Sequence, residues 1–385
     1  MLTQSIAPLV TERRIDEAHL QGDLVSHLQI SREEFVYRYG DYFDSYLATE
    51  PGRREFWSDS GAGLISYAQR GRYVLVGGGL IAPEAHKPQL LGEFVSYMQD
   101  AGLKSAFHNI GDDEVALFRE HGFQVTKWGE EPIVDLGSCT WGGKAYEWVR
   151  RQTNYCQRHG VTAAEVAPNM LTISQWERTL EEMIQVSAEC LAQKPQRREM
   201  RFFEGHIDDH EVGRRRVFVA RSGYGAGRME GFLVCTPMQG GRRWATELYR
   251  RRLDAVRGTV PFLFHQAMKQ MQEEGVEQMG LCLDPGLRCS EKLPGDSALV
   301  RLGMTYGETW LSAVFDVAGL RHFKSRFRPR YESRYVCVQP HVTIGSLMAF
   351  ARVSGLFDVD PWKVARILGN RVRKFASRST LSDAA

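Results

Sequence analysis

Long hydrophobic runs are missing from this 385-residue sequence. No stretch approaches the roughly 20 consecutive apolar residues that a transmembrane helix needs. The first residues, Met1-Leu2-Thr3-Gln4, also lack the basic region followed by an apolar region that marks a secretion signal. We therefore expect neither a membrane span nor secretion.

Paired cysteines are missing as well. The seven cysteines are scattered and form no CxxC pair, which argues against a disulfide framework or a zinc ribbon and favours a reducing, cytoplasmic compartment. His206 and His210 have a spacing that can hold a metal on a helix, but the HExxH pattern and an evident third ligand are missing. The sequence therefore predicts no metal site.

A strong excess of one charge sign is also missing, because the formal net charge is only +2. This excludes a protein that coats nucleic acid over its whole surface, and we expect no DNA partner. Local arginine clusters can still bind phosphates. They gather at residues 214–216, 242–243, 250–252 and 321–334.

The bulk composition is that of an ordinary globular protein, with 43% hydrophobic and 25% charged residues. The length exceeds what one hydrophobic core usually organises, so we expect two domains. From about residue 67 onwards, short apolar runs alternate with amphipathic segments, a pattern typical of a mixed α/β fold. Nothing in the sequence predicts the oligomeric state.

The expected elements form two similar successions. The first half has a polar, helical start up to about residue 60, then strands 73–76 and 105–109, helices 88–101 and 113–121, and a strand pair at 123–136 broken at Gly129. The second half has strands 161–166, 217–221, 229–237, 244–249 and 278–283 and helices 173–192 and 259–274. With a connecting helix at 142–159, the domains are predicted at 1–140 and 141–340, followed by a basic appendage at 341–385.

Three blocks of sequence carry a resemblance to a known family. They are FQVTKWGEEPIVDL with GGKAYEWVRRQTNYCQRHGV (within Phe123–Val161), ELYRRRLDAVRGTVPFLF (Glu247–Phe264) and GLRHFKSRFRPRYESRY (Gly319–Tyr335). Together they resemble the C-terminal synthase domain of the lysyl- and alanyl-phosphatidylglycerol synthases, the multiple peptide resistance family. The blocks follow one another in the family's order and at compatible separations.

The resemblance implies a fold and an activity. The fold would be α/β, with two tandem GNAT-like acyltransferase domains joined by a helix and the substrate site between them. The activity would be transfer of an amino acid from aminoacyl-tRNA to phosphatidylglycerol or another hydroxyl acceptor. The expected partners are aminoacyl-tRNA and an anionic lipid or membrane surface, and the expected location is the cytoplasm, with peripheral association at the inner face of the membrane.

The resemblance also implies site residues. Glu247 takes the place of a functional aspartate, Arg250 that of the arginine three residues later, and Lys324 that of a lysine in the ending motif. These three are the expected catalytic residues. The expected substrate-binding residues are Arg150, Arg151, Tyr249, Arg257, Gly258, Thr259, Asp284, Arg326 and Arg334.

The sequence departs from the family pattern at three places. Pro261 stands for the aspartate of the family's T-M-D-F, Arg257 for the asparagine before its glycine, and Leu283-Asp284-Pro285 for its A-P-L. Ordinary members also carry membrane helices, which this sequence lacks. These departures bear on the acceptor and the amino acid more than on the reaction type.

The expected catalytic residues would act mainly by positioning the substrates. An aminoacyl-tRNA ester is already activated, so transfer needs orientation and charge stabilisation rather than a covalent nucleophile or a cofactor, and proximity can supply about 7 to 11 kcal/mol of the barrier. Glu247 would orient the α-ammonium group, while Arg250 and Lys324 would hold phosphate or the developing oxyanion. On a regular strand Glu247 and Arg250 lie on opposite faces, so we expect the strand to end between them.

Other interpretations stay open. The cations from Arg321 to Arg334 alternate with aromatic residues, which suits single-stranded RNA or a solvated edge strand. Gly77 to Gly79 can cradle a phosphate or form a strand-end turn, and the basic tail after Pro361 can bind an anionic membrane or pack on the body. An acyl-CoA-dependent N-acyltransferase is the enzymatic alternative, although DAVRGT at 254–259 keeps one glycine of the pyrophosphate loop. A non-catalytic RNA- or membrane-binding module is the third interpretation.

Overall fold

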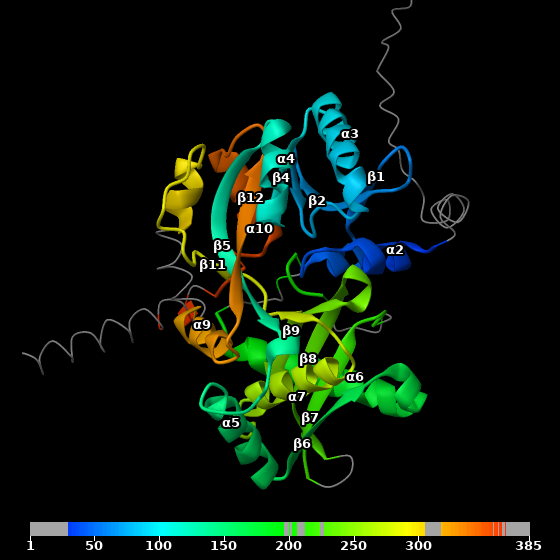
Figure 1. Ribbon diagram of the computed structural model, residues 1–385, viewed down its shortest axis with the longest axis vertical. Helices are drawn as coiled ribbons and strands as arrows, with labels where there is room; N and C mark the ends of the chain where they lie inside the picture. Colours follow the sequence, from blue (N-terminus) through cyan, green and yellow to red (C-terminus); the bar gives the residue numbers. More distant parts are fainter. Residues whose placement is uncertain are drawn as a thin grey trace, which may run out of the picture.

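The fold is that of a computed structural model, which describes residues 30–195, 200, 202–205, 212–223, 227–304, 317–356, 358–360, 362–363 and 366. One sheet runs through this part of the chain, with strands in the order β1-β2-β3-β4-β12-β5-β10-β9-β8-β7-β6, and β11 (Asp284–Pro285) pairs with β5. Helices pack on the sheet in two lobes, which Figure 1 shows one above the other. The predicted mixed α/β class is therefore confirmed.

The first half places a three-stranded meander beside a parallel strand. Strands β1 (Arg54–Trp57), β2 (Leu64–Arg70) and β3 (Tyr73–Val76) pair antiparallel, and after α3 (Lys87–Asp100) the chain enters β4 (Lys104–Ile110), which lies parallel to β3. The shorter helices are α2 (Arg32–Tyr39), η1 (Ser45–Thr49), η2 (Glu84–His86), η3 (Asp112–Glu114) and α4 (Val115–Glu120). The apolar side of α3, with Leu90, Leu91 and Phe94, is buried in the core of this half.

The second half repeats this succession. Strands β7 (Arg216–Ser222), β8 (Arg228–Met238) and β9 (Arg243–Arg251) form an antiparallel meander, α7 (Thr259–Glu273) follows, and β10 (Gln278–Gly280) lies parallel to β9. The other elements are η4 (Leu136–Ser138), α5 (Glu147–Arg158), β6 (Val161–Val166), η5 (Pro168–Met170), α6 (Ile173–Gln193) and η6 (Gln239–Gly241). The two halves therefore share one topology, although their sequences show no close repeat.

Two long strands join the halves. β5 (Gln124–Asp135) pairs with β12 (Arg330–Val338) along its length and with β10 of the second half at its end. Because β12 lies between β4 and β5, the chain returns to the first half after α9 (Val317–Ser325), and α10 (Ile344–Val353) contacts β3 there. The domain limits at residues 140 and 340 stay predictions, since one sheet continues across both.

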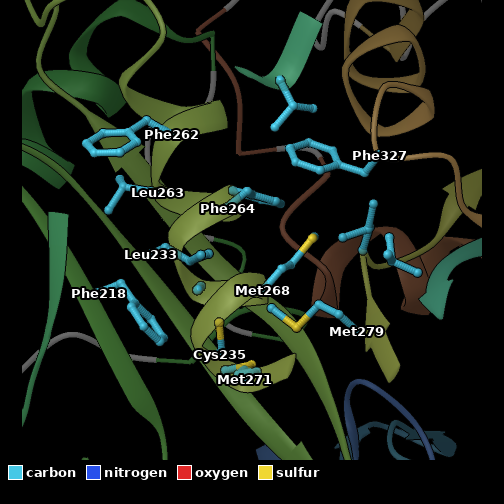
Figure 2. Close-up of a cluster of buried hydrophobic side chains, with 14 of the residues drawn as sticks. Phe218, Leu233, Cys235, Phe262, Leu263, Phe264, Met268, Met271, Met279 and Phe327 are labelled. Carbon is cyan, nitrogen blue, oxygen red and sulfur yellow. The ribbon is translucent and has the colours of Figure 1, made fainter. Parts of the chain in front are cut away.

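The apolar core of the second half surrounds α7, as Figure 2 shows. Its labelled members come from α7, β7, β8, β10 and the connection after α9: Phe262, Leu263, Phe264, Met268, Met271, Phe218, Leu233, Cys235, Met279 and Phe327. On α7 these apolar residues recur three and four positions apart, so one helical face is buried against the sheet. The helix begins after Gly258, whose φ of 91° is easily adopted only by glycine.

Two of the predicted elements need correction. The interruption at Gly129 is wrong, because β5 continues through it; glycine is needed there since a Cβ would lie 2.6 Å from the carbonyl oxygen of Asp284 in β11. The uniformly helical start is also wrong, since β1 lies within it. The predictions made for residues 1–29, for His206 and His210, and for the tail from residue 367 fall outside the described residues. Within the described ranges, no helix combines the length and the apolar character that crossing a bilayer requires.

Candidate active site in the seam between the halves

Strand β9 contains a bulge at Glu247. On either side of it, Thr246 is opposite Cys235 and Leu248 is opposite Val234, so Glu247 has no partner of its own in β8. An extra residue of this kind re-aims the side chains that follow, because it breaks the strict alternation of a regular strand. The strand faces that sequence spacing predicts for the side chains therefore do not apply to the residues after Glu247.

Glu247 and Arg250 consequently reach the same segment, residues 202–205. Glu204 accepts a hydrogen bond from Arg250, and a Cβ on Gly205 would lie 2.0 Å from Glu247 Oε1. The prediction that the strand must end between Glu247 and Arg250 is wrong, because β9 runs past Arg250 and the bulge supplies the change of face.

Glu247 belongs to a buried ion-pair chain that joins the two halves. Its side chain is 3% exposed, and Arg215 Nε lies 2.7 Å from its Oε2. The same guanidinium reaches Glu247 Oε1 at 3.3 Å and binds Glu50 of the first half, with Nη2 2.5 Å from Oε1. Both Glu247 oxygens are therefore engaged, and a substrate ammonium group would have to compete with Arg215 for them.

Arg250 leaves one of its three guanidinium nitrogens without a partner among the described residues. Its side chain is 6% exposed, Nη2 donates to Glu204 Oε2 at 2.7 Å, and Nη1 donates to the carbonyl oxygen of Tyr249 at 3.0 Å. Its Nε is buried and has no hydrogen-bond partner among the described residues. An unpaired buried donor costs about 1 to 3 kcal/mol, so this nitrogen suits an acceptor atom supplied by a substrate.

Lys324 of α9 binds the segment that carries Asp284. Its Nζ lies 2.7 Å from Asp284 Oδ1 and donates to the carbonyl oxygens of Cys282 at 2.9 Å and Leu283 at 3.3 Å. Both side chains are almost fully buried. Asp284 Oδ2 accepts no hydrogen bond within the described ranges, so it can receive a donor such as an α-ammonium group.

Cys282 lies between the charged residues of the two motifs. Its thiol contacts Thr246, the residue before Glu247, and its carbonyl oxygen binds Lys324. Burial raises the pKa of the thiol to about 12, Lys324 acts against this rise, and Glu247 acts with it. These contacts place Cys282 between strand β9, which carries Glu247, and helix α9, which carries Lys324.

Tyr249 precedes Arg250 on β9, and the centroid of its ring lies 6.3 Å from that of Phe323, the residue before Lys324. Burial raises the pKa of the Tyr249 hydroxyl, and the charges of Arg250, Glu204 and Asp284 also act on it. The structure thus gathers five of the predicted residues around one buried centre between the halves. We call this centre the seam site: Glu247, Tyr249, Arg250, Asp284 and Lys324.

A second group of predicted residues lies at a hollow beside α5 and the start of α7. The hollow has a volume of about 610 Å³ and is lined by Arg151, Gln152, Asn154, Tyr155, Gln157, Arg158 and Arg257. Three of these seven residues are arginines and none is acidic. Gly258 caps the nearby N-terminus of α7, and helix N-termini favour anions. This basic hollow therefore suits phosphate groups.

Three other predicted residues make local contacts. Arg150 donates to the carbonyl oxygen of Trp141 at 3.1 Å, and the Thr259 hydroxyl donates to the preceding turn at 2.6 Å. Arg326 lies over the ring of Trp148 on α5, with 5.9 Å between the guanidinium carbon and the ring centroid. These residues border the basic hollow or α5 and are not part of the seam site.

Arg334 lies in the sheet of the first half. It forms a buried pair with Glu131, with 2.6 Å between Nη2 and Oε2, and its strand, β12, is interior rather than at an edge. The interpretation of residues 321–334 as a solvated edge strand is therefore wrong. Part of this stretch is α9, and the rest returns to the sheet between β4 and β5.

Sequence reasoning missed the residues that hold the seam site in place. Arg215 and Glu204 bind two of its members, and Glu50 extends the chain of charges into the first half. The only sequence signal was the arginine cluster at 214–216. The carboxylate partners lie far from the matched motifs, so no spacing pointed to them.

Comparison with known proteins identifies the family. The model of the family described as phosphatidylglycerol lysyltransferase, C-terminal, matches residues 33–338. The phosphatidylglycerol lysyltransferase of Bacillus subtilis (strain 168) is 24% identical over 315 residues, which are 79% of this chain and 34% of that protein. The chain thus spans about a third of the length of the curated relatives it matches.

Two solved structures share the fold. One is the C-terminal domain (DUF2156) of an Agrobacterium fabrum protein described as a lysylphosphatidylglycerol synthetase, with a TM-score of 0.70, 27% identity, and 84% of this chain and 96% of that chain covered. The other is L-PGS from Bacillus licheniformis, with a TM-score of 0.69, 24% identity and the same coverage, 84% and 96%. The seam site lies inside the region that the family model matches. The chain therefore belongs to the family of phosphatidylglycerol lysyltransferase C-terminal domains.

Proposed function

We propose that this chain transfers an aminoacyl group from aminoacyl-tRNA to the headgroup of a phosphatidylglycerol-like lipid. The observation that carries the proposal is the seam site, where Arg250 and Asp284 each have one buried polar atom without a partner in the described part of the chain and Lys324 adds a fixed cation. The name of the Bacillus subtilis relative, phosphatidylglycerol lysyltransferase, supports an aminoacyl group as the transferred group and phosphatidylglycerol as the acceptor.

The free atoms of the seam site match an aminoacyl ester. Asp284 Oδ2 can accept a hydrogen bond from the α-ammonium group, and Arg250 Nε can donate to the carbonyl oxygen, which becomes negative in the tetrahedral transition state. The acceptor hydroxyl oxygen bonds to the carbonyl carbon, the bond to the tRNA ribose oxygen breaks, and the hydroxyl proton ends on that ribose oxygen. Glu247 keeps Arg215 in place. The ester is already activated, so the reaction requires no further cofactor.

The basic hollow gives the tRNA a place to bind. Arg151, Arg158 and Arg257 line it without an acidic neighbour among the lining residues, and phosphate contacts of this kind dominate the affinity for nucleic acids. The acceptor would enter from a lipid surface, so the chain would work at the inner face of a membrane.

A lipid analysis tests this function. The purified chain is incubated with mixed charged tRNAs and vesicles that contain phosphatidylglycerol, and the lipids are extracted for mass spectrometry. We expect an aminoacylated lipid with the unchanged chain and none above background with Lys324→Ala. Turnover of acetyl-CoA without this product would overturn the proposal in favour of an acyl-CoA-dependent enzyme, and tRNA binding without any product would overturn it in favour of a non-catalytic module.

Lys87→Ala is the matched control. Lys87 lies on the first half and its side chain, like that of Lys324, is almost fully buried; it pairs with Asp41, Glu84 and Glu114. Both substitutions leave buried carboxylates without their cation, so both cost folding stability. Only Lys324→Ala should remove the product from protein that is still folded, as measured by circular dichroism.

A further inference from the structure

A second set of unpartnered polar atoms lies in the first half, where the parallel strands β3 and β4 end. Asp44 and Asn109 are 2% and 1% exposed, and Asn109 Nδ2 donates to Asp44 Oδ2 at 2.8 Å. The other oxygens, Asp44 Oδ1 and Asn109 Oδ1, have no hydrogen-bond partner in the described part of the chain. Two buried acceptors side by side are thus left for a donor from elsewhere.

Arg53 adds a cationic donor to this set. Its Nη2 donates to the carbonyl oxygen of Phe202 at 2.8 Å, and its guanidinium lies 5.1 Å from the centroid of that ring. Its Nη1 is buried and unpaired among the described residues. Burial lowers the pKa of Arg53 and the Asp44 carboxylate acts against that shift, yet these two residues form no direct ion pair. The Arg53 guanidinium and the Asp44 carboxylate are therefore close to each other but form no ion pair.

Gly77 lies between these two charges, and the space beside it would take a methyl group. A Cβ at this position would lie 3.4 Å from Arg53 Nη1 and 3.5 Å from Asp44 Oδ2. The backbone of Gly77 does not have the positive φ of Gly78 at 87°, so its glycine is not required by conformation. Asn109 has a φ of 67°, in the left-handed region that asparagine adopts more readily than most other residues.

We propose that Asp44, Arg53 and Asn109 form an acceptor subsite that binds the glycerophosphoryl headgroup of the lipid, an inference that rests on the proposed function. The two free oxygens accept hydrogen bonds from two glycerol hydroxyls, and Arg53 Nη1 donates to a phosphate oxygen. Inorganic phosphate has one or two hydroxyl donors near neutral pH, but it would place its negative charge against the Asp44 carboxylate, whereas a polyol phosphate can offer uncharged hydroxyls there. The set therefore selects a polyol phosphate over phosphate alone.

Residues 202–205 connect this subsite with the seam site. Phe202 binds Arg53, and Glu204 binds Arg250. Phe202 and Glu204 are two positions apart in the chain, so one short segment contacts both sets of free atoms. The lipid headgroup is held by the first half and the aminoacyl ester by residues that include Arg250 of the second half, which brings the two substrates together at the seam.

A binding experiment without tRNA tests the subsite. Soluble glycerophosphoglycerol is titrated into the full chain and followed by calorimetry or ligand-observed NMR. Asp44→Asn and Arg53→Gln should each weaken binding about 10- to 100-fold, because each removes one charged hydrogen bond. Gly77→Ala should weaken it by filling the space between the charges, whereas Arg54→Gln, at an exposed neighbouring position, should not change it.

The outcomes separate the subsite from the proposed function. Headgroup binding that these variants weaken, without any transfer product, supports the subsite and overturns the function. A transfer product with unchanged headgroup affinity and unchanged lipid KM in Asp44→Asn and Arg53→Gln overturns the subsite alone. Inorganic phosphate that binds as tightly as glycerophosphoglycerol overturns the selection for a polyol. Should Asp44→Asn not fold, Asn109→Gly takes its place, since glycine accepts the positive φ at residue 109.

Discussion

The seam site and the basic hollow carry the same kind of charge in opposite settings. In the seam site each cation is buried against a carboxylate, as Lys324 is against Asp284. In the hollow Arg151 is 77% exposed, and its carboxylate neighbour Glu147 lies 3.9 Å away. Buried charges act strongly and in fixed geometry, whereas exposed charges are weakened by water and salt. The seam site is therefore suited to stabilising a transition state and the hollow to attracting a polyanion.

The largest effect should come from removing the buried cation of the seam site. Lys324→Ala should lower the rate of aminoacyl transfer about 10²- to 10³-fold, because Lys324 fixes Asp284, and losing one preorganised group at a reacting centre has an effect of this size. Single-turnover transfer, corrected for the folded fraction, measures this effect. A loss of the same size in Lys87→Ala would show that buried charge in general, and not the seam site, limits the rate.

The acceptor subsite should give a stability effect that depends on pH. Burial raises the pKa of Asp44 to about 6, although Asn109, the backbone N–H of Gly78 and the charge of Arg53 act against the rise. The unfolded chain releases this proton near pH 3.9, roughly the ordinary value for aspartate. Between these pH values the folded state binds more protons than the unfolded state, so stability falls as pH rises from about 4 to about 6.

Asp44→Asn should abolish that fall. Its size is on the order of 3 kcal/mol, the free energy that corresponds to this pKa difference. Urea unfolding of both proteins at pH 4.5 and pH 7 measures the part of this fall within that range, about 2 kcal/mol. Equal changes of the free energy of unfolding in the two would mean that Asp44 titrates normally and is not the buried carboxylate described above.

A smaller effect is expected from changing the shape of a seam cation while keeping its charge. Arg250→Lys removes the planar guanidinium and its free Nε, so we expect about a tenfold lower kcat with little change in KM for tRNA. Arg251→Lys changes the exposed neighbour on the same strand and should leave kcat within twofold or so of the original. Similar losses in both variants would contradict the role given to Nε.

The smallest effects should appear at the basic hollow. Arg257→Gln should raise the KM for tRNA by a few-fold and leave kcat unchanged, because one phosphate contact is worth little at physiological salt. The slope of log affinity against log salt should become shallower by about 0.7 to 0.9 for each phosphate that the protein no longer binds. Filter binding over a salt series measures both, with the exposed Arg70 of the first half as control. An unchanged slope would remove Arg257 from the tRNA surface.

Much of the fold could be predicted from the sequence, because the patterns that indicate helices and strands lie within short segments. Apolar periodicity and stop residues predicted strand 161–166 at the bounds of β6 and helix 259–274 within one residue of α7. The motifs also brought Glu247, Arg250 and Lys324 to attention, and the structure gathers them in one place. Local pattern and short motif spacing are enough for such features.

Other features depend on interactions between distant segments. The bulge at Glu247 arises from pairing with β8. The regular alternation of side chains along a strand therefore predicted the wrong faces for Glu247 and Arg250. From the sequence alone, Gly129 resembles a strand break. Glycine is needed there because the backbone of Asp284 approaches closely, and Asp284 lies more than 150 positions later in the sequence. Asp44, Arg53 and Asn109 were missed since no motif links them and only the folded chain shows that their atoms are left unpaired.

The most direct measurement is a double-mutant cycle at the seam. Arg250 belongs to the second half, Asp284 pairs through β11 with β5, and each keeps one free buried atom. Single-turnover transfer is measured for Arg250→Lys, Asp284→Asn and the combined variant. If both atoms hold one aminoacyl ester, the combined loss should be clearly smaller than the product of the two single losses. Losses that simply multiply, or transfer that survives both changes, would contradict a shared site between the halves.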